Sequence, residues 1–256
     1  MSNANLPRAR TSATNLVASL NGESGESVTD RLRKATAAVE GRVVFTTSFG
    51  IEDQLIAHHI FTHGLPIEVA TLDTGRLFSE TYALWKETED RYGAKIRAFH
   101  PDEDAVHAFV AEHGLDGFYE SKDARLSCCD IRKVEPLSRA LSGASAWVTG
   151  IRSDQSYLRA DTRLVDWDND RRLIKIAPLF DYSRARVVSE CAQLGVPVNE
   201  LHAKCFLSIG CAPCTRAIRP GENERAGRWW WENDDKKECG LHVDSSGKLV
   251  RTPVPA

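Results

Sequence analysis

Short apolar runs rich in β-branched residues alternate with longer amphipathic segments, and this alternation most constrains how the 256-residue chain can fold. The short runs have the length and composition of buried strands, and the longer segments have helical spacing. Strands are predicted at 42–48, 67–73, 95–99, 146–149 and 172–176, and helices at 28–40, 54–63, 78–92, 104–112, 130–141 and 182–194. The pattern predicts an α/β fold with a doubly wound, mostly parallel sheet and helices on both faces.

The domain organisation follows from where this pattern begins and ends. We expect an N-terminal arm at 1–27, one α/β domain at 28–219 that binds a nucleotide and a cluster, and a C-terminal catalytic tail at 220–256. The tail is polar, contains Trp229-Trp230-Trp231 and ends in a proline-containing stretch. A chain of this length is compatible with a single α/β unit.

Charge and hydropathy exclude several functional classes. The net charge of −3 gives no overall attraction for nucleic acid or a membrane surface. No apolar run reaches the roughly 18–20 residues that span a bilayer. The N-terminus lacks the apolar stretch of a secretory signal, so we expect a cytoplasmic protein. Arg8 and Arg10, with no acid before Glu23, leave an organellar transit peptide as the alternative. The sequence leaves open whether the chain forms a homo-oligomer.

Two turns after predicted strands have the pattern of an anion site. Ser48-Phe49-Gly50 joins the first strand to a helix, and Asp73 to Arg76 follow the second strand. A strand–turn–helix unit directs backbone N–H groups toward a phosphate, and doubly wound sheets bind ligands at the carboxyl ends of their strands. Ordinary turns are the alternative, in which Asp73 caps the next helix. The Gly-Lys-Ser/Thr element of a Walker loop is missing.

Cysteines give the strongest chemical signal. Two pairs, Cys128-Cys129 and Cys211-x-x-Cys214, read as metal or redox groups in a chain without an export signal. Side chains of adjacent cysteines diverge, which suits two irons of a [4Fe–4S] cluster better than one zinc ion. Zinc and unligated thiols remain alternatives. We expect Cys191 in the core and Cys205 in a structural role.

A seventh cysteine, Cys239, lies apart from the others in a polar segment near the C-terminus. Lys236, Lys237 and His242 surround it and favour the thiolate, and Gly240 frees the backbone. The functional hypothesis is a nucleophile on a lid that closes over the substrate, and the alternative is an inert surface thiol.

Local basic residues supply the positive charge that an anionic substrate needs and that the net charge of the chain does not provide. Arg152, Arg225 and Arg228 are candidate phosphate or sulfate ligands. Lys133 lies four positions after Cys129, so on a helix it faces the same side as that cysteine. For any one arginine the alternative is a solvated surface position.

Taken together, these motifs resemble the assimilatory adenosine 5′-phosphosulfate reductases of the PAPS/APS reductase family. The matching pieces are Ser48-Phe49-Gly50, Leu72-Asp73-Thr74-Gly75-Arg76, Cys128-Cys129 with Arg132-Lys133-Val134, Gly150-Ile151-Arg152, Gly210-Cys211-Ala212-Pro213-Cys214, Gly227-Arg228-Trp229-Trp230-Trp231-Glu232 and Glu238-Cys239-Gly240-Leu241-His242. They cover the chain from Arg42 to His242, and both cysteine pairs together with the tail motif are highly specific.

The resemblance implies an adenine-nucleotide α-hydrolase-like fold and a thioredoxin-dependent reduction of adenosine 5′-phosphosulfate to sulfite and AMP. Cys239 is then the nucleophile and forms an S-sulfocysteine, and a [4Fe–4S] cluster has a mainly electrostatic role. Fourteen residues follow His242, whereas plant-type relatives carry a thioredoxin-like domain there, so an external thioredoxin is expected. Implied cluster ligands are Cys128, Cys129, Cys211 and Cys214, and implied substrate contacts are Ser48, Phe49, Gly50, Asp73, Arg76, Lys133, Arg152, Arg225, Arg228 and His242.

Three other functions are alternatives for a chain with these motifs. The reductase of the 3′-phosphorylated substrate shares the fold and the tail cysteine but lacks the four cluster cysteines. An adenylating enzyme that thiolates tRNA needs a Ser-Gly-Gly-x-Asp-Ser loop, from which Ser48-Phe49-Gly50-Ile51-Glu52-Asp53 departs. A zinc-stapled binding module without catalysis is the third alternative.

Overall fold

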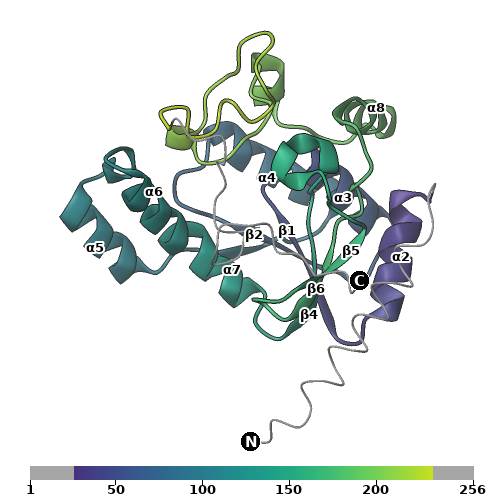
Figure 1. Ribbon diagram of the computed structural model, residues 1–256. Coiled ribbons are helices and arrows are strands. Elements are labelled where there is room, and N and C mark those ends of the chain that lie inside the picture. Colours follow the sequence, from purple (N-terminus) through teal and green to yellow (C-terminus); the bar gives the residue numbers. More distant parts are fainter. Residues whose placement is uncertain (1–25, 233–256) are drawn as a thin grey trace, which may run out of the picture.

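Figure 1 shows the computed structural model, which describes residues 26–232. Within this range the chain forms a six-stranded sheet in the order β3-β2-β1-β4-β6-β5. All neighbouring strands are parallel except β5, which runs antiparallel to β6 at one edge. The strands are β1 (Arg42–Thr47), β2 (Glu68–Leu72), β3 (Arg97–Phe99), β4 (Ala144–Val148), β5 (Val165–Asp168) and β6 (Leu173–Ile176).

The strand order places a ligand-binding position in the middle of the sheet. The chain proceeds from β1 outward through β2 and β3, then returns to pair β4 with the other side of β1. Phe45 of β1 is in register with Val69 of β2 and Val148 of β4, so the carboxyl ends of the three strands lie at one edge. A parallel sheet binds ligands at such a reversal of strand order.

Helices cover both faces of the sheet, as predicted. Leu55 and Ile60 of α3 belong to a large apolar core with residues of α2, α4 and α8, whereas Leu137 and Ala140 of α7 pack with Trp147 in a second core. Burial of these two apolar layers stabilises the three-layer arrangement. The helices are α2 (Val28–Ala38), α3 (Ile51–Thr62), α4 (Ser79–Tyr92), α5 (Glu103–His113), α6 (Lys122–Cys129), α7 (Glu135–Ala140) and α8 (Arg184–Leu194).

Helices α5 and α6 extend to the left of the sheet in Figure 1 and enclose a third, smaller core. Phe109 and Phe118 are buried there with the four paired cysteines and Trp229. This core therefore joins α6 to the segment after α8, which lies at the top of Figure 1. None of the helices within residues 26–232 has the length and apolarity to cross a bilayer.

The structure corrects two elements of the sequence prediction. The helix expected at 130–141 starts earlier, as α6, and passes through a π-helical turn (Asp130–Val134) into α7. Strand β5 was not predicted, because its four residues Val-Asp-Trp-Asp carry two acidic groups and read as a polar loop. The mainly parallel α/β fold is confirmed.

Candidate active site

A cavity of about 190 Å³ opens at the carboxyl ends of β1, β2 and β4. Its walls come from the turn at Ser48, the 149–151 segment, the 207–210 segment, and 224–228. We call this space the nucleotide cavity, after the ligand that the sequence predicts for it. Four cations line it, namely Lys133, Arg159, Arg225 and Arg228, together with the acids Glu52, Asp53 and Glu224. A cation-rich cleft at a strand-order reversal is suited to a small anionic ligand.

The turn after β1 is shaped to present backbone groups to this cavity. Phe49 adopts a left-handed conformation with φ of 58°, and its ring is buried against Trp85 at a centroid distance of 5.6 Å. Gly50 is the N-cap of α3 and offers no side chain to the N–H groups of the first turn. Those groups and the positive end of the helix dipole therefore face the nucleotide cavity, the arrangement that binds phosphate.

Asp53 is an unexpected acid in this turn. Its Oδ2 accepts hydrogen bonds from the Ser48 backbone N–H at 2.6 Å and from the Ser48 hydroxyl at 2.7 Å. Burial raises the pKa of Asp53 to about 6, and this effect prevails although the bonds from Ser48 lower it. The carboxyl group thus fixes the Ser48 side chain and titrates close to neutral pH.

The cations of the nucleotide cavity are held by aromatic and polar neighbours. The Arg228 guanidinium lies 4.6 Å from the Trp229 ring centroid and donates to the Ile209 carbonyl at 3.5 Å. Buried Arg159 donates to Gln155 Oε1 at 2.6 Å. Such contacts orient a guanidinium before a ligand binds and reduce the entropy lost on binding.

Four thiols surround a second, adjoining cavity. Cys128 and Cys129 come from the end of α6, and Cys211 and Cys214 from a short 3₁₀ turn after α8. All four are buried at 7–8% exposure. The two cysteine pairs, 82 positions apart between Cys129 and Cys211 in the sequence, are therefore brought together around one space, which we call the cysteine cavity.

Cations also surround the cysteine cavity. Burial raises the pKa of the Cys214 thiol to about 12, and it raises that of Cys128 too. At Cys211 burial acts in the same direction, but the charge of Lys133 and a contact with Thr74 outweigh it and leave the pKa below its ordinary value. The Thr74 hydroxyl oxygen lies 3.3 Å from the Cys211 sulfur. These surroundings therefore favour the thiolate at Cys211 and the neutral thiol at Cys128 and Cys214.

The donor set fits a multi-iron group. In a [4Fe–4S] cluster each cysteine binds its own iron, so four thiols around a shared space, with cations nearby, are a suitable set.

Lys133 lies on the walls of both cavities. The π-helical turn that carries it also carries Arg132, which donates to the Thr74 carbonyl at 2.7 Å. A π-helical turn displaces side chains from ordinary helical positions and is common at functional sites. One ammonium group therefore sits between the cysteine pairs and the nucleotide cavity.

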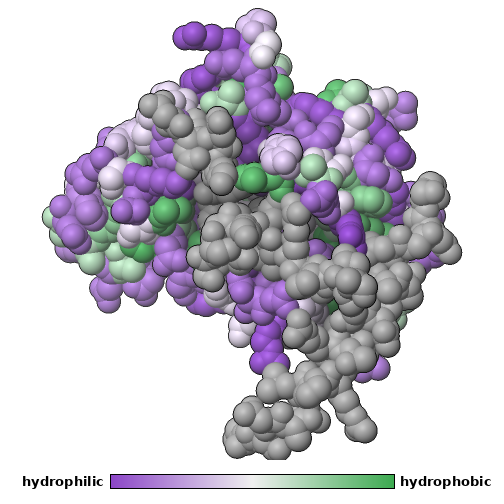
Figure 2. Space-filling view, viewed as in Figure 1, coloured by the Kyte–Doolittle hydropathy of each residue, from purple (hydrophilic) through white to green (hydrophobic). Residues whose placement is uncertain are grey.

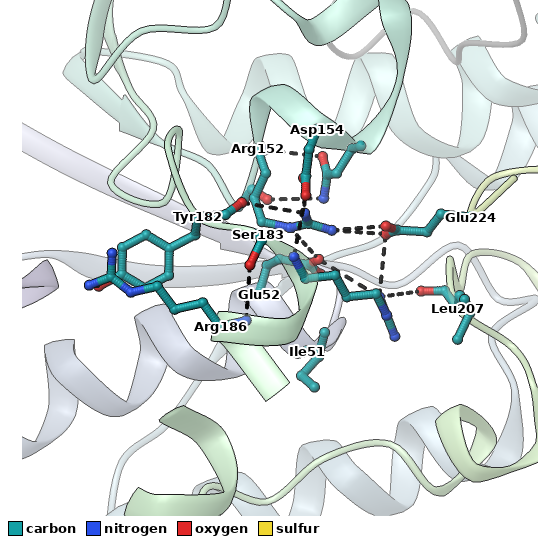
Figure 3. A network of polar contacts seen from close by, with 12 residues as sticks. Ile51, Glu52, Arg152, Asp154, Tyr182, Ser183, Arg186, Leu207 and Glu224 are labelled. Carbon is teal, nitrogen blue, oxygen red and sulfur yellow. Dashed lines mark hydrogen bonds and ion pairs between the residues drawn. The ribbon is translucent and has the colours of Figure 1, made fainter. Parts of the chain in front are cut away.

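Three predicted site residues lie outside the walls of the nucleotide cavity. Asp73 accepts hydrogen bonds from the Gly75 N–H at 2.9 Å and the Tyr82 hydroxyl at 2.6 Å, and so shapes its own turn. Arg76 lines the cysteine cavity, where it pairs with Asp116. Arg152 is fully buried in an ionic network (Figure 3). Their contacts with substrate stay predictions.

The remaining predicted residues are placed as follows. Ser48, Phe49, Gly50, Lys133, Arg225 and Arg228 line the nucleotide cavity. Cys191 is buried in α8, as expected, and Cys205 is exposed and lines neither cavity. Cys239 and His242 lie outside the described residues.

Sequence analysis missed Arg159 and Glu224, which also line the nucleotide cavity. Arg159 follows Gln155 by four positions in the loop after β4, and a polar loop at the carboxyl end of a central strand is the signal that could have indicated it. On the face seen in Figure 2, hydrophilic residues predominate among the coloured atoms, with apolar ones interspersed.

Comparison with known proteins identifies the family. A model of the phosphoadenosine phosphosulfate reductase domain matches residues 42–217, more than half of the chain. The chain belongs to the phosphoadenosine phosphosulfate reductase family. The predicted resemblance is thereby confirmed, and with it the enzyme class, an oxidoreductase acting on a sulfur group.

Curated relatives in this reductase family are closely similar. Adenosine 5′-phosphosulfate reductase from Agrobacterium fabrum is 54% identical over 220 residues, which cover 86% of this chain and 84% of that protein. The enzyme of the same name from Allochromatium vinosum is 52% identical over 200 residues, 78% of each chain. A crystal structure of phosphoadenylyl-sulfate reductase from Candida auris, in a phosphate complex, matches 79% of this chain and 96% of its own with a TM-score of 0.67 and 25% identity.

Proposed function

We propose that this reductase converts adenosine 5′-phosphosulfate to sulfite and AMP through a covalent intermediate on Cys239. The observation that carries the proposal is the juxtaposition of the nucleotide cavity with the four-cysteine cavity, with Lys133 on the walls of both. The names of the curated relatives support the same substrate.

The chemistry assigns a role to each wall of the nucleotide cavity. The N-terminus of α3 and Ser48 bind the 5′-phosphate, and Arg225 and Arg228 neutralise the charge that grows on AMP as it leaves. Lys133 lies against the sulfo group. A [4Fe–4S] cluster held by Cys128, Cys129, Cys211 and Cys214 would add electrostatic polarisation there, and both electrons come from thiols.

The reaction is balanced as three thiolate displacements. The Cys239 thiolate attacks the sulfur of the phosphosulfate, an S–S bond forms, and the S–O bond breaks with its electron pair leaving on AMP. A thiolate of reduced thioredoxin then attacks the Cys239 sulfur and sulfite leaves with an electron pair, which gives a mixed disulfide. The second thioredoxin thiolate attacks this disulfide, closes the thioredoxin disulfide and releases the Cys239 thiolate. This need for a dithiol is why we assign the enzyme to the reducing cytoplasm.

The first test is the intact mass of the protein mixed with adenosine 5′-phosphosulfate but no reductant. We expect a gain of about 80 Da, one sulfo group, which disappears on addition of reduced thioredoxin. Cys239→Ser should bind AMP like the wild type but show no mass gain, and Cys205→Ser, which changes an exposed thiol outside both cavities, is the matched control. Turnover by Cys239→Ser would remove Cys239 from the mechanism.

The related 3′-phosphorylated substrate is the second candidate, because the Candida auris structure is a phosphoadenylyl-sulfate reductase. Sulfite release from each nucleotide, measured side by side, discriminates the two. We expect a clear preference for the unphosphorylated nucleotide. Glutathione in place of thioredoxin should support little turnover, and equal rates with both would contradict the assignment of thioredoxin as the reductant.

A further inference from the structure

We propose that Arg152 and Glu224 are positioning residues that hold the segment bearing Arg225 and Arg228 against the nucleotide cavity. This inference rests on the proposed function and assigns to Arg152 a role other than direct substrate contact. It arises from an ionic network that joins three walls of that cavity (Figure 3).

Arg152 is the centre of the network. Its side chain is 0% exposed. Nε donates to Glu52 Oε1 at 2.8 Å, and Nη2 donates to both carboxylate oxygens of Glu224 at 3.1 and 3.0 Å. Nη1 pairs with Asp154 and lies 3.5 Å from the Tyr182 carbonyl oxygen. The guanidinium is therefore saturated by protein groups and does not reach the nucleotide cavity.

A second guanidinium extends the network. Arg184, at the start of α8, donates to Glu224 Oε1 at 3.3 Å and to the Leu207 carbonyl at 3.1 Å. It also lies 3.9 Å from Glu52 Oε1. Two arginines thus share two carboxylates, and the main chain at Leu207 is held by the same group.

The network connects segments that are distant in the sequence and adjacent in the cavity wall. Glu52 belongs to the first turn of α3, beside the phosphate-binding turn. Leu207 begins the 207–210 wall, and Glu224 directly precedes Arg225. All three residues line the nucleotide cavity, whereas Arg152 lies behind them. Arg152 can therefore set their relative positions without contacting the ligand.

Burial explains why the connection is firm. A buried guanidinium requires charged partners, because desolvation without them is strongly unfavourable. If Glu224 moved away from Arg152, the buried guanidinium would lose a charged partner at a large desolvation cost. Arg225, the next residue in the chain, therefore stays close to the nucleotide cavity. Arg225 is then ordered before the nucleotide arrives, and less conformational entropy is lost on binding.

The test uses the full-length enzyme and AMP as the probe, with the dissociation constant measured by calorimetry. Glu224→Gln keeps the shape of the side chain and removes its charge, and we expect about tenfold weaker AMP binding. The matched control is Glu222→Gln, two positions earlier, which breaks a pair with Arg216 away from the network and should change the constant less than about twofold. A wild-type constant for Glu224→Gln would overturn the proposal.

A double-mutant cycle separates positioning from a general loss of structure. If Glu224 acts through Arg225, then Glu224→Gln should weaken AMP binding far less in an Arg225→Ala background than in the wild type. Equal effects in both backgrounds would show that Glu224 acts independently of Arg225 and would also overturn the proposal. Folding of each variant is checked by circular dichroism at the temperature of the titration.

The outcomes also distinguish this inference from the proposed function. Absence of AMP binding to the wild-type enzyme would contradict the nucleotide site itself. Binding by the wild type with unaltered binding by Glu224→Gln would contradict only the positioning role. Arg152→Lys gives a further check, because lysine keeps the charge but cannot bridge Glu52 and Glu224 with a planar fork, so AMP binding should weaken.

Discussion

At the scale of single residues, Asp53 is the group whose protonation bears most directly on ligand binding. It lines the nucleotide cavity, fixes Ser48 and lies in the first turn of α3. Its folded-state pKa of about 6 is above the ordinary value of 3.8, so the group is mainly protonated below pH 6 and mainly ionised above it. An ionised Asp53 opposes the charge of a bound phosphate.

This titration predicts a pH-dependent difference between the wild type and Asp53→Asn. Asn keeps one oxygen to accept both bonds from Ser48 but carries no charge. At pH 7.5 the variant should bind AMP about three- to tenfold more tightly than the wild type, and the ratio of dissociation constants should approach one near pH 5. Taking the ratio cancels the titration of AMP itself. A ratio that does not vary with pH would place the phosphate elsewhere.

Residue identity alone indicated some of these roles and not others. Lys133, Arg225 and Arg228 were predictable as cations near cysteines, and all three line the nucleotide cavity. The network partners of Arg152 were not predictable, because Glu52 and Glu224 lie 100 and 72 positions away from it in the sequence. Sequence shows that a residue is charged, but its partners depend on the tertiary fold.

At the scale of elements, α6 is the support for both the cysteine cavity and the start of the C-terminal segment. Arg125 of α6 is 1% exposed and donates to Glu232 through Nε and Nη2, at 2.8 and 3.0 Å. Its guanidinium also lies 4.7 Å from the Trp229 ring centroid. Residue 232 is therefore anchored to the same helix that carries Cys128 and Cys129.

Breaking this pair should destabilise the enzyme. Glu232→Gln leaves Arg125 buried with a neutral partner, and we expect a loss of about 3 kcal/mol, equivalent to a fall in Tm of about 6–12 °C. The control is Glu190→Gln, which breaks an exposed pair with Arg186 on α8 and should change Tm by less than about 2 °C. Differential scanning calorimetry measures both, and equal shifts would argue against the anchor.

The elements themselves were predictable where their apolar pattern is strong. The parallel strands β1, β2, β3, β4 and β6 and helices α2, α4, α5 and α8 fall within a few residues of their predicted positions. Helix α6 was missed because only two of its eight residues besides the two cysteines are apolar, and those cysteines were considered only as ligands. The π-helical turn at Asp130–Val134 has no recognisable sequence signal.

At the scale of the whole molecule, partly buried histidines link stability to pH. Burial lowers the pKa of His59 to about 4, and it lowers those of His58 and His202 as well. His59 on α3 shares a hydrogen bond with Thr29 of α2 at 2.8 Å. Because the unfolded chain takes up protons near the ordinary pKa of 6.5, the stability that neutral histidines contribute is complete above that pH and is lost as pH falls toward 4.

The expected result is a lower Tm at pH 5 than at pH 7. His59 alone should account for at most about 2 kcal/mol between these values. The raised pKa of Asp53 changes stability with pH in the opposite direction over part of this range. The contribution of His59 is therefore isolated by comparing the pH dependence of Tm of His59→Gln with that of the wild type. The variant should show a smaller fall. An identical fall in both proteins would exclude His59 as a contributor.

The global arrangement of the sheet was only partly predictable. A mainly parallel, doubly wound sheet follows from the alternation of strands and helices, but the order of the strands does not. The placement of β4 beside β1 decides where the nucleotide cavity lies, and it arises from long-range pairing such as Val44 with Trp147. The convergence of the two cysteine pairs depends on the same topology.

The anchor at Glu232 limits how far from it Cys239, the proposed nucleophile, can lie. Cys239 follows Glu232 by seven positions, and a chain of that length spans at most about 25 Å whatever its conformation. One thiol confined to a sphere of that radius has an effective concentration of roughly tens of millimolar, similar to the effective concentration that a short flexible linker gives. Lengthening the spacer should dilute the nucleophile, so first-order sulfo transfer would slow gradually as residues are inserted between these two positions.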